Sequence, residues 1–182
     1  MKPLQQSVFA GLLLGMALLP SAQAIGGSAA PTSWLGHKID PAQTPFCHEQ
    51  GCTLIEVRSN DSNRMGWHDG TMRAYQLRDG SQLEVDVRPE GWISNARLQF
   101  KRSRMTAQDH RTAATFLTAV TGRTFRAGAI ASCEQAGLAL NNPDAYGPEQ
   151  PLSHWKTPNG LPYKARCGVG SQVGVWAGWM QQ

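Results

Sequence analysis

The fold is decided by residues 72–87, which read MRAYQLRDGSQLEVDV. Two runs of β-strand composition flank Asp79-Gly80, a dipeptide that suits the two-residue turn of a β-hairpin. A turn at this place puts the more apolar pairs on one face, namely Met72 with Val87, Ala74 with Val85 and Gln76 with Leu83. The other face then carries Arg73 opposite Asp86 and Tyr75 opposite Glu84. This sorting predicts an antiparallel pair with one buried face.

Further strands are predicted on both sides of the hairpin. Pro89-Glu90-Gly91 forms a second turn, and apolar residues then alternate with polar ones from Ala96 to Lys101. Residues 53–58 form another strand, and the tail from 163 to 180 forms the last. In that tail the glycines share one parity, so that a helix, another backbone, an aromatic ring or a ligand can approach the strand closely.

Two helices are predicted between the meander and the tail. Thr106 and Asp109 resemble a capping box, and Gly122 supplies the stop of a helix over 106–121. Its apolar stripe consists of Ala113, Phe116, Leu117 and Val120. A weaker helix spans about 129–140, with Ile130, Cys133 and Leu140 on one face. The fold class is therefore α+β, an antiparallel β-meander packed by one or two helices.

The first 46 residues predict that the protein is exported and that a flexible N-terminal arm precedes its domain. Lys2, the apolar run 8–19 and the small-residue ending at Ala24 are typical of a cleaved signal peptide over 1–24. The run is too short to span a bilayer, so no transmembrane segment is expected in the mature chain. Residues 25–46 have linker composition and are expected to form a flexible N-terminal arm. Residues 47–182 then form a single α+β domain of a periplasmic or secreted protein.

The four cysteines allow three pairings. Export favours disulfides, because thiols oxidise outside the cytoplasm. Cys47 and Cys52 are close in sequence and meet often, which favours 47–52 together with 133–167. The second bridge would tie the C-terminal strand back to the body. Cys47, His48 and Cys52 could also be read as metal ligands, but their spacing is looser than that of a zinc site. We therefore predict no metal and no cofactor.

One candidate catalytic pair is present, His68 and Asp69, next to Trp67. It combines a group that titrates near neutrality with a carboxylate. Adjacent residues of an extended segment point to opposite sides, however, and no nucleophile or second base is evident. No segment matches a catalytic signature. An enzyme is therefore the less favoured interpretation.

The sequence does not disclose the function, and it favours binding. The formal net charge is +4, and basic residues gather around the first helix and the strand before it. The candidate binding residues are Arg97, Lys101, Arg102, Arg104, Arg111 and Arg123, with Trp67 and Trp155 as exposed aromatics. Such a face attracts anionic polymers. We expect a non-catalytic envelope or extracellular module that binds a partner protein or an anionic polymer. The alternative is a small secreted hydrolase of wall polysaccharide or nucleic acid that uses His68 and Asp69. The oligomeric state is not predicted.

Overall fold

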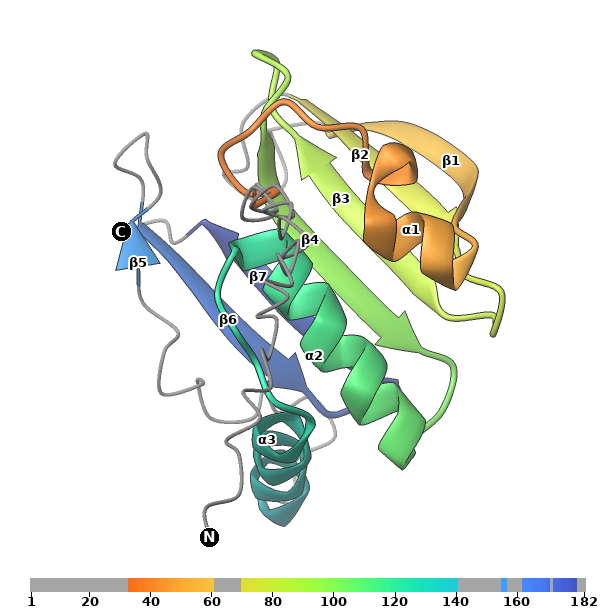
Figure 1. The fold of residues 1–182 in the computed structure, drawn as a ribbon, viewed down its shortest axis with the longest axis vertical. Coiled ribbons are helices and arrows are strands. Elements are labelled where there is room, and N and C mark those ends of the chain that lie inside the picture. The colour runs from red at the N-terminus through yellow and green to blue at the C-terminus, as the bar shows by residue number, and fades with distance from the viewer. Residues whose placement is uncertain (1–32, 61–69, 141–154, 157–161, 171, 180–182) are drawn as a thin grey trace, which may run out of the picture.

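The computed structural model describes residues 33–60, 70–140, 155–156, 162–170 and 172–179. Within these residues one antiparallel sheet has the strand order β1-β2-β3-β4-β7-β6-β5. The strands are β1 (Thr53–Asn60), β2 (Gly70–Gln76), β3 (Gln82–Val87), β4 (Ile93–Phe100), β5 (Trp155–Lys156), β6 (Pro162–Gly168) and β7 (Val173–Trp179). The helices are α1 (Pro45–Gln50), α2 (Ala107–Thr121) and α3 (Ala127–Ala139). All three helices lie on the same face of the sheet (Figure 1), which confirms the α+β prediction.

The hairpin of β2 and β3 is present, but its predicted register is wrong by one residue. The loop contains Arg78, Asp79 and Gly80 rather than two residues, and Leu77 N donates to Ser81 O across 2.8 Å. Gly80 has a φ of 84°, which glycine adopts at little cost in such a loop. The extra residue shifts every pair, so the observed pairs include Tyr75 with Leu83, Ala74 with Glu84, and Met72 with Asp86. Tyr75 and Leu83 are therefore the buried pair.

Helix α2 forms where its end signals predict it. The Asp109 amide donates to the Thr106 hydroxyl across 3.2 Å, and the Asp109 carboxylate accepts from the Thr106 amide across 2.7 Å. This capping box satisfies amides that have no partner inside the helix. Gly122 ends the helix in the left-handed conformation, with a φ of 69°. The predicted stripe is fully buried, and it faces β4 and β7.

Helix α3 begins two residues before its predicted start and is tied to the sheet by the predicted Cys133–Cys167 disulfide. Ile130 and Cys133 are buried as expected. Leu140 is not, because it lies beyond the last helical residue and is 60% exposed. Gly137 takes the buried position instead, since only one helical turn separates it from Cys133.

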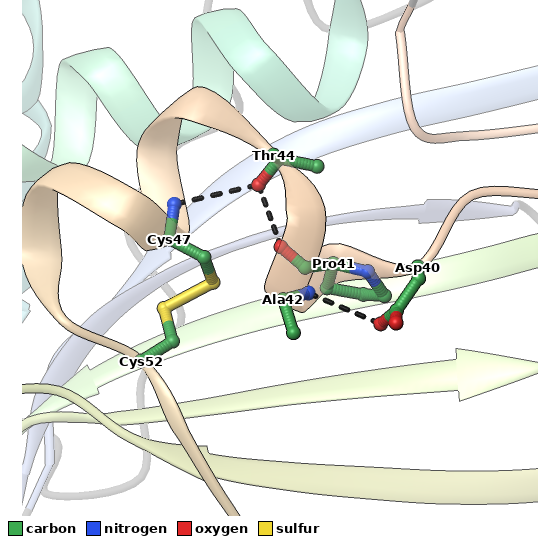
Figure 2. The surroundings of a disulfide bond; sticks show 6 residues. All are labelled: Asp40, Pro41, Ala42, Thr44, Cys47 and Cys52. Carbon is green, nitrogen blue, oxygen red and sulfur yellow. Dashed lines mark hydrogen bonds between the residues drawn. A yellow bond between two sulfur atoms is a disulfide. The ribbon is translucent and has the colours of Figure 1, made fainter.

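Residues 33–46, the described part of the predicted flexible arm over 25–46, are packed on the domain. Trp34 and Leu35 are buried, and the Trp34 ring lies 6.0 Å from Phe46 and 5.9 Å from Phe116. Figure 2 shows how the following residues turn back: the Thr44 hydroxyl caps α1, and the Cys47–Cys52 disulfide closes the helix onto β1. The large apolar side chains of Trp34, Leu35 and Phe46 anchor this stretch in the core. The proline and glycine content, on which the prediction of an arm was based, does not reveal such anchors.

The predicted C-terminal strand is two strands, β6 and β7, which pair with each other. Strand β7 also pairs with β4, so the last described strand lies inside the sheet rather than at its edge. The signal-peptide prediction concerns residues 1–24, which lie outside the described residues. Within the described part of the chain, no helix has both the length and the hydropathy needed to cross a membrane.

Candidate binding surface

The candidate catalytic pair, His68 and Asp69, lies outside the described residues together with Trp67, and so does most of the proline-rich stretch 141–162. The structure describes the other predicted residues. Cys47 and Cys52 are bonded to each other, so their sulfur atoms are not metal ligands. His48 lies beside them on the exposed side of α1.

The predicted basic residues lie at three separate places. Arg97 projects from β4 on the face opposite the helices. Lys101, Arg102, Arg104 and Arg111 surround the start of α2, where Arg102 forms an ion pair of 3.3 Å with Asp109. Arg123 follows the other end of this 15-residue helix, which is about 22 Å long. There its guanidinium lies 5.9 Å from the Trp155 ring.

The sheet face opposite the helices carries no described helix, and we call it the uncovered face (Figure 1). Cross-strand pairing places four side chains side by side on it. These are Glu84 in β3, Arg97 in β4, Trp176 in β7 and Arg166 in β6. We call this set the tryptophan row. Arg97 forms an ion pair of 3.7 Å with Glu84, and the Arg166 guanidinium lies 5.8 Å from the Trp176 ring.

Glycines flank Trp176 on the uncovered face. Gly174 and Gly178 lie two residues before and after it in β7, and Gly168 lies opposite Gly174 in β6. A Cβ atom at Gly178 would collide with the Trp176 ring and with the Asn95 side chain. The missing side chain therefore lets the ring lie down along its own strand. Among the uses that the glycine parity allowed, Gly178 has the close approach of an aromatic ring, and Gly174 has that of the neighbouring β4 backbone, because a Cβ atom there would collide with Leu98 O.

A hollow of about 130 Å³ borders this ring. It is lined by Glu84, Asp86, Asn95, Ala96, Arg97 and Trp176. Asn95 is buried, its amide nitrogen donates to the Asp86 carboxylate across 3.2 Å, and its oxygen accepts from Trp179 N across 3.0 Å. The hollow thus combines an aromatic edge with acceptors and a guanidinium that have defined positions.

Sequence reasoning identified Arg97 here but missed Trp176 and Arg166. A signal was present, because Trp176 shares the parity of Gly174 and Gly178 and is the one bulky residue among them. A tryptophan between two glycines on one face of a strand indicates a ring that is accessible from that face. Arg166 could not be placed beside it without knowing that β6 and β7 pair.

A second group of arginine and aromatic side chains closes one end of the core. The Arg88 guanidinium lies 5.3 Å from the Trp92 ring and 5.2 Å from the Trp179 ring. Trp155 stacks on Tyr163, whose ring is fully buried. Burial raises the pKa of the Tyr163 hydroxyl, which has no hydrogen-bond partner among the described residues. Because these side chains are largely buried, we assign the group to stability, and this assignment includes Arg123 and Trp155.

The fold and the surface together define a disulfide-bonded α+β domain whose sheet is covered by helices on one face. No family model matches the chain, and neither a curated protein nor a solved structure is significantly similar to it.

Proposed function

We propose that the protein is an exported, non-catalytic module of the cell envelope or extracellular space that binds an acidic polysaccharide on its uncovered face. The tryptophan row carries this proposal. It places an aromatic ring between two arginines, Arg97 and Arg166, on a sheet face whose neighbouring glycines add no bulk. An extended chain of sugar rings needs a shallow, flat surface of this kind.

Each part of the surface matches one chemical feature of such a ligand. The Trp176 ring offers an apolar plane for the CH face of a pyranose. Arg97 and Arg166, with Lys164 in the next row of β6, offer positive charge for carboxylates. The acceptors Glu84 and Asp86 border the hollow and suit sugar hydroxyl groups.

Export is part of the proposal. Two observations support it, namely the signal-peptide pattern of residues 1–24 and the two disulfides. Disulfides persist in oxidising compartments and are rare in the cytosol. The alternative, a hydrolase that uses His68 and Asp69, concerns residues outside the described ones and stays a prediction. We put binding forward because the described surface carries it.

The test is a calorimetric titration of the purified protein with polygalacturonate, in which neutral dextran serves as the reference polymer. We expect binding to polygalacturonate alone, and we expect it to weaken as salt is added because counterions screen the arginines. Trp176→Ala should weaken binding about tenfold or more, which corresponds to about 1.4 kcal/mol. The Trp176 ring is only partly buried and lines a surface hollow rather than the core, so the same substitution should leave the protein folded.

Arg111→Ala is the matched control. Arg111 is an exposed arginine on α2 that contacts Gln108, and it lies on the other side of the sheet. Unchanged binding in this variant, together with loss in Trp176→Ala, would support the uncovered face. Loss of binding in Arg111→Ala with unchanged binding in Trp176→Ala would instead place the binding site at the start of α2. An absence of binding to polygalacturonate and to a second acidic polymer, alginate, would refute the polysaccharide proposal and leave a partner protein as the alternative.

A further inference from the structure

The two edges of the sheet differ in length and composition. Strand β5 ends one edge with only two residues, whereas β1 ends the other with eight. Within the described residues, β1 pairs with β2 alone, so its outer side presents unpaired backbone groups. Long edges of this kind recruit further strands unless something blocks them.

The side chains of β1 are unusually apolar for an exposed edge. Leu54, Ile55 and Val57 are 50%, 52% and 55% exposed, and they are three of the four large hydrophobic side chains that are exposed in the described structure. No lysine or proline, the residues that commonly block an edge, occurs in the strand. A bulge at Ile55 interrupts the pairing with β2, but the register from Glu56 to Asn60 is regular.

The charges of β1 are complementary to those of a second copy of the same strand. Glu56 and Arg58 lie two residues apart, so both point to the uncovered face, where they form an ion pair within the strand. Hydrogen bonding to Arg58 lowers the pKa of the Glu56 carboxyl, which is therefore ionised at neutral pH. An antiparallel copy centred on Val57 would bring Glu56 opposite Arg58 twice, once on each side of the centre.

We propose that the protein forms a two-fold symmetric dimer through antiparallel pairing of β1 with β1 of a second copy, centred on Val57. Antiparallel strands of one sheet are related by an axis perpendicular to that sheet. The two uncovered faces would therefore lie on the same side of one continuous sheet. The interface is isologous, which is the usual arrangement in homodimers. Since two strand edges bury little area, the dimer should be reversible and visible at high protein concentration.

Charge exchange tests this proposal by sedimentation equilibrium over a range of protein concentrations. Glu56→Arg and Arg58→Glu each replace two attractive pairs by two repulsive ones, and each should weaken dimerisation about tenfold or more. The double variant E56R/R58E restores opposite charges and should return the dimerisation constant to within about threefold of the original. Lys156→Glu on the short β5 edge is the control and should change nothing.

Cysteine cross-linking tests the register. Val57→Cys places a thiol opposite its own copy, within the Cα separation that a disulfide requires. Ser59→Cys, on the same face of the same strand, would have its Cα about 14 Å from that of its copy and should not cross-link. Rapid oxidation of Val57→Cys alone to a covalent dimer is the expected result. A monomer at all concentrations, equal effects of the single and double charge variants, or equal cross-linking at both positions would overturn the proposal.

Discussion

The two faces of the sheet are built from the same strands and differ in burial. In β4, Leu98 is completely buried under the helices, whereas the preceding residue, Arg97, has a side chain that is 40% exposed on the uncovered face. Neighbouring residues of a strand point to opposite sides, so one residue step separates the core from the surface. The comparison indicates that the covered face holds the core, whereas the uncovered face is the surface on which we propose binding.

The largest expected effect comes from the covered face. Leu98→Ala should lower the free energy of unfolding by about 2–5 kcal/mol, because it leaves a cavity between β4 and its neighbours. Arg97→Ala, one residue away, should change it by about 0.5 kcal/mol or less, as expected for an exposed ion pair. Urea denaturation of both variants measures the contrast. Similar losses in the two variants would contradict the division between the faces.

The disulfides should rank next. Replacing Cys133 and Cys167 by alanine should cost about 4 kcal/mol in the chain-entropy model, because this bond closes a long loop between α3 and β6. Replacing Cys47 and Cys52 should cost about 2 kcal/mol, since they are only five residues apart. Denaturation of the two double variants gives the order. A larger loss for the 47–52 pair would mean that α1 contributes more to the covered face than its size suggests.

A polar contact of the helix layer should have a smaller effect. Glu134 is buried, and its carboxylate accepts from Met105 N across 2.7 Å and contacts His110 Nε2 at 2.7 Å. Glu134→Ala should therefore cost about 1–3 kcal/mol, because it leaves buried groups without partners. Gln135→Ala, at the next and exposed position of α3, is the control for helix propensity. Equal denaturation midpoints in the two variants would exclude a stabilising role for the carboxylate.

The smallest expected effect has the opposite sign. The buried Tyr163 hydroxyl has no hydrogen-bond partner among the described residues, so Tyr163→Phe should leave stability at neutral pH unchanged or raise it by up to about 1 kcal/mol. Burial raises the pKa of Tyr163 above its ordinary value of 10.0. The unfolded chain therefore ionises first, and the protein loses stability as the pH rises above about 10. The variant should lose less, which denaturation at pH 8 and pH 11 can measure.

Much of the fold follows from the sequence, and the candidate surface follows only in part. The ends of α2 were predictable because Thr106, Asp109 and Gly122 act on backbone groups within one helical turn. The hairpin register was not, since a two-residue and a three-residue loop both accommodate Asp79-Gly80. Burial of Trp34 was missed for another reason, because its partners Phe46 and Phe116 belong to other segments.

By itself, the sequence determined the positions of β1 to β4, α2 and α3 and which residues of each strand share a face, and it favoured the cysteine pairing that forms. It did not predict α1 or β5, and it predicted one strand where β6 and β7 form. The properties that it determined depend on residues that are close along the chain, or on the few thiols available. Only the tertiary structure decided that β7 lies between β4 and β6, and hence that Arg97, Trp176 and Arg166 are neighbours. Alternation along a strand specifies the face to which a side chain points. The order of the strands specifies which side chains of other strands lie next to it, and that order is selected by the packing of the whole sheet.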